Sequence, residues 1–252
     1  MSGHSKWASI KHKKAATDAK RGKLFSRVIK EITVAARQGG GDMDANPRLR
    51  TAVQKAKDSN MPADNIDRAI KKGTGELPGT SYDEQVYEGY GVGGVAIMVD
   101  TLTDNKNRSA SEIRSIFSKN NGNLAGVGSV AWIFNKKGYI TVPMNLADEE
   151  TLFLAVTESG AEDFKAEEDQ YEIYTDPSAL EAVKEAVKNA GIEYEVAEIT
   201  YLPQNTIKIA DIAETRQVLR LIDALEEHDD VQNVYANFDI PDEILAQLES
   251  DS

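Results

Sequence analysis

An apolar stripe near the start of the chain has the spacing of an amphipathic helix. Beginning at about residue 20, apolar side chains recur every three or four positions: Phe25, Val28, Ile29, Ile32 and Ala36. Residues 39–41 are all glycine, which adopts the positive φ of a helix end. We therefore predict one amphipathic helix that ends at this glycine run.

Two shorter helices are predicted to follow. Asn46 is placed to cap a helix whose first turn holds Pro47, and Pro62 is placed to open another helix that ends at Gly73. The apolar positions of both helices face inward, so the three helices predict a small bundle. Their outer faces carry the basic residues Arg48, Arg50, Lys55, Lys57, Arg68, Lys71 and Lys72.

Beyond a glycine-containing linker at 73–79, the pattern changes to mixed helix and strand. Two strands, 82–90 and 95–101, are predicted to form a hairpin through the glycine turn 91–94. The spacing of Ser109 and Glu112 is that of a capping box and predicts the start of a helix. A further strand is predicted at 130–134.

The next segment has an order of its own. Its predicted elements are strand 139–142, helix 148–158, strands 163–165 and 171–174, helix 177–190 and strand 193–200. This β-α-β-β-α-β order is that of a ferredoxin-like sandwich. A strand at 206–209, a long helix and a strand at 231–238 follow, and we expect them to complete the sheet left open at Phe134.

These elements predict an α+β protein in which one ferredoxin-like domain is inserted in another. The predicted domains are 1–75, a basic arm and helical bundle; 76–135 with 204–252, an outer ferredoxin-like domain; and 136–203, the inserted one. Among 252 residues there is no cysteine, and no apolar run approaches the roughly 20 residues that span a membrane. We expect a soluble, cytoplasmic protein without a membrane partner.

Charge is divided very unevenly along the chain. Residues 1–75 hold seventeen Lys and Arg against seven Asp and Glu, whereas residues 76–252 hold twelve against thirty-five. A basic module in an acidic chain is typical of a protein that binds a polyanion. We therefore predict nucleic acid as the partner of residues 1–75.

The candidate contacts lie in the arm and the first two helices. We define the basic ridge as Lys20, Lys23, Arg27 and Lys30, which share the face of the first helix opposite its apolar stripe. The full set of predicted nucleic-acid contacts is Lys6, Trp7, Lys11, His12, Lys13, Lys14, Lys20, Arg21, Lys23, Arg27, Lys30, Arg48 and Arg50. Trp7 is a candidate for stacking on a base, or for folding back onto the bundle, and Arg21 lies nearer the apolar side of its helix.

Other motifs do not favour catalysis. The glycines at 89–94 precede a strand, whereas a dinucleotide loop precedes a helix, and the glycines at 122–128 lack the ending of a phosphate-binding loop. The segment 104–108 suits either a polar contact or helix capping. Acidic groups at 148–150, 167–169 and 228–230 are interpreted as solvated charge. We expect no enzyme activity, small-molecule substrate, cofactor or metal.

Several motifs in order resemble the YebC/PmpR family. They include Met1–Trp7, Ala19–Lys23, Asn46–Arg50, Asn60–Pro62, Ile70–Gly73, Tyr87–Gly91, Asp104–Arg108, Gly122–Leu124 and Gly128–Ala131. The resemblance covers essentially the whole chain. It implies a cytoplasmic protein of three domains, commonly described as a probable transcriptional regulator that binds DNA.

The resemblance leaves the partner open. The family also includes a mitochondrial translational activator, and bacterial relatives are implicated in relieving ribosomes stalled on proline-rich chains, which implies an RNA-binding, ribosome-associated role in translation. A third hypothesis is a protein-interaction adaptor whose basic end binds an acidic protein surface. The sequence does not determine the choice between DNA and ribosomal RNA, or the oligomeric state.

Overall fold

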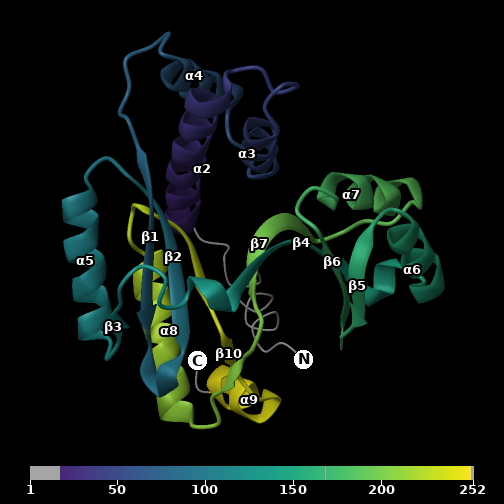
Figure 1. Ribbon diagram of the computed structural model, residues 1–252. Coiled ribbons are helices and arrows are strands. Elements are labelled where there is room, and N and C mark those ends of the chain that lie inside the picture. The colour runs from purple at the N-terminus through teal and green to yellow at the C-terminus, as the bar shows by residue number, and fades with distance from the viewer. Residues whose placement is uncertain (1–17, 168, 251–252) are drawn as a thin grey trace. The chain divides into compact units, whose positions relative to one another are not determined.

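The structure is a computed structural model that describes residues 18–167 and 169–250 (Figure 1). The chain forms two compact units. The smaller unit spans Trp132–Asn205, and the larger one comprises the described residues on either side of it. The smaller unit contains the predicted insert; the domain boundaries themselves stay a prediction.

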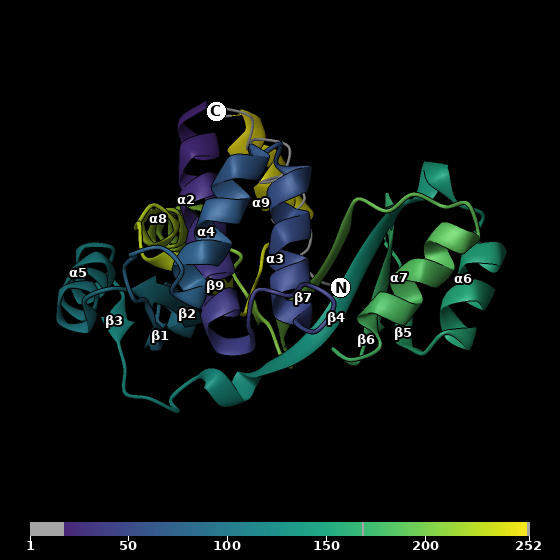
Figure 2. The ribbon, with the colours of Figure 1, turned by 90° about the horizontal axis from the view of Figure 1, so that it is seen from above.

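The larger unit begins with the predicted helical bundle. Its helices are α2 (Asp18–Gly39), α3 (Pro47–Asp58) and α4 (Ala63–Thr74), and both short helices pack against α2 (Figure 2). Their shared core is apolar and includes Val28, Ile32, Leu49, Val53 and Ile66. The stripe read from the sequence is therefore the buried face of α2.

Two helix ends follow the predicted chemistry and a third does not. Asn46 Oδ1 accepts a hydrogen bond from Leu49 N at 3.1 Å, which confirms the predicted cap of α3, and Gly40 ends α2 with φ 84°. The predicted stop at Gly73 is wrong, because α4 continues to Thr74 and Gly75 carries the positive φ of 84°. Gly73 instead allows close packing, since a Cβ there would lie 2.5 Å from Thr33 O.

A four-stranded antiparallel sheet forms the second layer of this unit, in the order β3-β1-β2-β9. The strands are β1 (Asp83–Tyr90), β2 (Ala96–Thr103), β3 (Asn123–Leu124) and β9 (Val231–Ala236). The β1–β2 hairpin confirms the predicted glycine turn at 91–94, which includes the short 3₁₀ segment η1 (Val92–Gly94).

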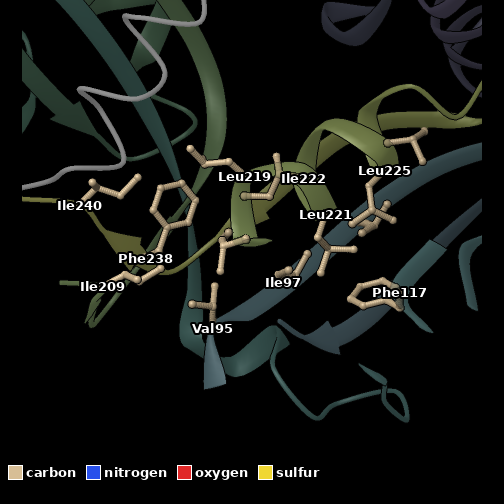
Figure 3. Close-up of a cluster of buried hydrophobic side chains, with 14 of the residues drawn as sticks. Val95, Ile97, Phe117, Ile209, Leu219, Leu221, Ile222, Leu225, Phe238 and Ile240 are labelled. Atoms are coloured by element: carbon tan, nitrogen blue, oxygen red, sulfur yellow. The ribbon is translucent and has the colours of Figure 1, made fainter. Parts of the chain in front are cut away.

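Helices α5 (Lys106–Lys119) and α8 (Ile212–Glu226) share one core with this sheet. Figure 3 shows four buried residues of this cluster. Ile97 lies in β2, Val95 directly precedes β2, Phe117 lies in α5 and Leu221 in α8. A parallel pair, β8 (Ile207–Lys208) and β10 (Phe238–Asp239), and the helix α9 (Asp242–Ser250) complete the unit.

Three predictions about this layer are corrected. Residues 131–133 form a 3₁₀ turn, η2, instead of a strand, and Phe134 belongs to the sheet of the other unit. The strand near 206–209 pairs with β10, outside the four-stranded sheet. Helix α5 begins three residues before the predicted capping box, because Asn105 Oδ1 caps it by accepting from Arg108 N.

The smaller unit is a ferredoxin-like sandwich, as predicted. Its elements are β4 (Phe134–Pro143), η3 (Met144–Leu146), α6 (Glu149–Glu158), β5 (Ala161–Ala166), β6 (Gln170–Thr175), α7 (Leu180–Asn189) and β7 (Val196–Pro203). The antiparallel strand order is β5-β6-β4-β7. Its core joins Ile140 and Ile173 of the sheet to Leu152 of α6 and Val183 of α7. The α+β class is thus confirmed.

Candidate nucleic-acid interface

For eight of the predicted contacts, the structure does not describe the side chain. The arm residues Lys6, Trp7, Lys11, His12, Lys13 and Lys14 lie outside the described residues. Lys20 and Arg21 belong to α2 by backbone, and nothing is described of their side chains. The remaining predicted contacts, Lys23, Arg27, Lys30, Arg48 and Arg50, have described surroundings.

Three residues of the basic ridge contact the end of α8. Lys23 Nζ donates to Glu227 O at 2.9 Å, and Arg27 donates to Glu226 O. Lys30 Nζ donates to the carbonyl oxygen of Asp229 at 3.0 Å. These carbonyls lie at and just beyond the C-terminus of α8, where unpaired C=O groups and the helix dipole favour positive charge.

The half-buried Arg27 is subject to two opposing effects. Burial lowers the pKa of its guanidinium, and the carboxylates of Glu226 and Asp229 oppose that shift. The ridge side chains that the structure describes are therefore held by the protein itself, a role that sequence reasoning did not assign to them.

Asp230 is the buried acceptor at the centre of this contact. Its side chain is 4% exposed and accepts hydrogen bonds from Lys30 Nζ at 2.8 Å and from Arg108 Nη2 at 2.8 Å. Ser109 Oγ donates at 2.7 Å and Thr103 Oγ1 at 3.0 Å. Burial acts to raise the pKa of Asp230, but the hydrogen bonds from Lys30, Arg108 and Ser109 outweigh it and hold this pKa well below its ordinary value.

Sequence reasoning missed Asp230, because residues 228–230 were interpreted as solvated charge. That interpretation is wrong for Asp230 and for His228, whose Nε2 lies 2.8 Å from Glu112 Oε2. A signal was present in the chain, since an Asp directly before the apolar Val231 of a predicted strand is a candidate for burial. Within 104–108, Asn105 caps α5 and Arg108 pairs with Asp104 and Asp230, so the capping interpretation describes this segment.

Arg48 is also engaged within the protein. Its Nε lies 2.7 Å from Glu31 Oε1, and its Nη1 lies 2.7 Å from Glu84 Oε1 and from Gln38 Oε1. Burial opposes the charged form, but the hydrogen bonds to Glu31 and Glu84 raise the pKa of Arg48. Arg48 thus connects α3 to α2 and to β1.

Other cations of the bundle remain exposed. We define the outer cations as Arg50, Lys55 and Lys57 of α3 with Arg68 and Lys72 of α4. The side chain of Arg50 donates to the carbonyl of Met43 at 3.2 Å, and the side chains of the other four make no hydrogen bond or ion pair with residues 18–167 or 169–250. Lys71 differs, since its Nζ lies 2.8 Å from Asp67 Oδ2.

A second buried carboxylate fixes the loop that leads to η2. Glu88 of β1 is 3% exposed and accepts from Gly128 N at 2.7 Å, Val130 N at 2.6 Å and Ala131 N at 2.8 Å. Burial acts to raise the pKa of Glu88, and these backbone donors lower it overall. Because these N–H groups bind a carboxylate, they are not available to a strand ladder.

Within the described residues, no group of three or more His, Asp or Glu side chains is placed to hold a metal ion. No helix of the described chain has the length and apolar character needed to cross a bilayer.

Two family models match the chain. Residues 5–76 match the TACO1/YebC protein N-terminal domain, and residues 82–238 match the TACO1/YebC second and third domain. A protein of Desulfatibacillum aliphaticivorans named "Probable transcriptional regulatory protein" is 58% identical over 98% of this chain and 100% of its own length. A protein of Syntrophobacter fumaroxidans with the same name is also 58% identical, over the same shares.

A solved structure is similar as well. The crystal structure of a conserved hypothetical protein from Aquifex aeolicus matches with a TM-score of 0.81 and 52% identity. The match covers 90% of this chain and 94% of that one.

Proposed function

The chain belongs to the TACO1/YebC family, and from that membership we propose that it is a non-enzymatic regulator of gene expression that binds nucleic acid. The observation that carries the proposal is the charge division, with seventeen cations against seven acids in residues 1–75 of a chain whose net charge is −13. Lys and Arg bind a phosphate backbone by neutralising it and releasing counterions. We expect a protein with this partner to act in the cytoplasm.

Two further findings support the proposal. The similar proteins are named probable transcriptional regulatory proteins, and the similarity extends over their whole length. The bundle also keeps five outer cations exposed, so a phosphate backbone has cationic side chains to bind. The acidic remainder of the chain is repelled by the same backbone, which orients the basic end toward it.

Ribosomal RNA is the second candidate partner. Three of the five outer cations are lysines, which bind phosphate as point charges and do not read bases with the bidentate geometry of arginine. Recognition of shape and backbone, as in structured RNA, suits this set. A translation factor that binds the ribosome is therefore the alternative form of the same proposal.

The binding test is a salt titration of the full chain with a short DNA duplex and with a ribosomal RNA hairpin. Affinity is expected to fall by roughly 0.9 log units per log unit of salt for each duplex phosphate neutralised. Replacing Lys11, Lys13 and Lys14 by Glu should abolish most of this binding. The matched control replaces three exposed lysines of the smaller unit, Lys136, Lys165 and Lys188, by Glu and should bind as the parent does. Failure to bind either polymer at low salt would leave the adaptor hypothesis.

Sedimentation of ribosomes separates the two partners. Co-migration that survives nuclease trimming of messenger RNA, and that is lost in the variant with Lys11, Lys13 and Lys14 reversed, supports translation. A sequence-specific footprint on one promoter that persists at high salt supports transcription.

A further inference from the structure

The cations of the bundle fall into two groups that differ in their surroundings. Lys23, Arg27 and Lys30 of the basic ridge donate to acceptors between Glu226 and Asp230. The five outer cations of α3 and α4 are exposed. A side chain that already satisfies a carbonyl and a buried carboxylate must give up those bonds before it binds a phosphate.

Releasing the ridge is costly because its central acceptor is buried. The side chain of Lys30 is 15% exposed and that of Asp230 is 4% exposed. Withdrawing Lys30 leaves the Asp230 carboxylate with fewer donors in a site that water hardly reaches. Removing one partner of a buried ion pair is strongly destabilising, because the other charge is left uncompensated. A phosphate contact made in high-dielectric solvent does not offset such a loss.

The outer cations can bind a phosphate without first breaking a buried ion pair. Helices α3 and α4 together hold seven cations and the acids Asp58, Asp64 and Asp67. Arg48 is neutralised by Glu31 and Glu84, and Lys71 by Asp67, so the five outer cations face two remaining acids. Their spacing places Arg68 and Lys72 one turn apart on α4, and Arg50 and Lys57 two turns apart on α3, so each helix presents a basic edge.

We propose that the phosphate-binding surface of the bundle consists of the outer cations Arg50, Lys55, Lys57, Arg68 and Lys72, whereas the ridge residues Lys23, Arg27 and Lys30 hold α2 against the end of α8. This inference rests on the proposed function and names the residues that perform it. The occupant is the sugar-phosphate backbone of a nucleic acid, selected by charge complementarity with two exposed helix faces.

The test compares two sets of charge-removing substitutions in the full chain. One variant replaces the five outer cations by Gln, and the other replaces Lys23, Arg27 and Lys30 by Gln. Each is titrated with a fluorescent DNA duplex over a range of NaCl concentrations, and its unfolding by urea is followed by circular dichroism. Binding gives the number of neutralised phosphates through the log–log salt slope, and unfolding gives stability.

The outer-cation variant is expected to bind less tightly at low salt and to keep the parent unfolding midpoint. Its salt slope should be smaller by about 0.9 for each phosphate that it no longer neutralises. The ridge variant is expected to keep the parent slope and to unfold at lower urea concentration. Should the ridge variant prove too unstable to study, Lys23→Gln alone removes one exposed donor and should leave the slope unchanged.

The opposite pattern would overturn the inference: a reduced slope in the folded ridge variant with a parental slope in the outer-cation variant. Equal slopes for the parent and the outer-cation variant would overturn it as well, while binding by the parent would leave the proposed function standing. A parent chain that binds no duplex and no ribosomal RNA hairpin at low salt would instead remove the proposed function.

Discussion

At the scale of single residues, two buried carboxylates organise the larger unit. Asp230 accepts hydrogen bonds from side chains of α2, α5 and β2. Glu88 accepts three hydrogen bonds from backbone N–H groups, two in the loop before η2 and one at Ala131, the first residue of η2. Both side chains are almost fully buried. A buried carboxylate is stable only when its oxygens are hydrogen-bonded, so each fixes the segments that supply its donors.

Asp230→Asn should lower the free energy of unfolding by about 3 kcal/mol at neutral pH, because Lys30 and Arg108 lose their anionic partner. The pKa of Asp230 is depressed in the folded protein, so its contribution is present above the unfolded-state value of about 3.9 and is lost as pH falls through the folded value. Urea unfolding at a series of pH values measures this difference. The difference between parent and variant should shrink as pH falls below about 4.

The matched control for this variant is Asp229→Asn, which removes an exposed neighbouring carboxylate and keeps the carbonyl that Lys30 uses. We expect a change in the free energy of unfolding within about 0.5 kcal/mol. A stability difference between the parent and the Asp230→Asn variant that stays constant down to acid pH would contradict the assignment.

Glu88→Gln should loosen the loop that ends at η2. The amide of Gln places an N–H group among the N–H donors of Gly128, Val130 and Ala131, so at least one of these bonds is lost, at about 1–3 kcal/mol. Amide hydrogen exchange measured by NMR should show faster exchange at these three positions. Exposed Glu193→Gln in the smaller unit serves as the control, and unchanged exchange in the loop would refute the role of Glu88.

At the scale of elements, the packing of α4 on α2 requires a glycine inside a helix. A Cβ at Gly73 would lie 2.5 Å from Thr33 O and 2.7 Å from the Cβ of Ala36. Helix propensity alone disfavours glycine at this position. The close approach of the two helices thus outweighs the intrinsic preference of the chain.

Two Gly→Ala substitutions should therefore change the free energy of unfolding in opposite directions. Gly73→Ala should destabilise the protein by about 1–3 kcal/mol through overpacking. Gly22→Ala, in α2 with no atom near the added Cβ, should stabilise it by about 0.5–1 kcal/mol through reduced backbone entropy of the unfolded chain. Thermal and urea unfolding measure both. A Gly73→Ala variant as stable as the parent would contradict the packing argument.

At the scale of the whole molecule, the smaller unit has one apolar core, and the larger unit has two, one in the helical bundle and one shared by the sheet with α5 and α8. Phe134 and Pro203, near the two ends of the smaller unit, are paired across β4 and β7. Paired residues of antiparallel strands lie about 4.5–5.5 Å apart, so the chain enters and leaves this unit at neighbouring points. That arrangement lets a domain be inserted without distorting the sheet of its host.

Residues 132–205 produced alone should therefore fold cooperatively, with a free energy of unfolding of at most about 3–5 kcal/mol, because a single core of this size rarely supplies more. The complementary chain, with Ala131 joined to Thr206 through a short glycine-serine linker, should keep the helical content of the larger unit. Circular dichroism and urea unfolding measure both. Noncooperative unfolding of the isolated segment would argue against independent units.

The sequence predicted most of the elements from local information. The α2 stripe, the cap at Asn46, the β1–β2 hairpin and the element order of a ferredoxin-like insert all follow from spacing and turn chemistry within a few residues. The sheet to which β8 belongs, the start of α5 and the structure at 131–133 were mispredicted. Two of these depend on distant partners, the pairing of β8 on β10 and the turn on Glu88, whereas the start of α5 is set by the neighbouring cap at Asn105.

The sequence by itself determined the division of charge and the amphipathic faces, because both depend only on which residues stand at which spacing. Only the tertiary structure decided which cations remain exposed. Lys23 contacts a carbonyl 204 positions away, and Lys30 contacts a carboxylate 200 positions away, so no local pattern reveals that they are engaged. Hydrogen bonding to such distant acceptors separates the cations that hold the fold together from those that face solvent.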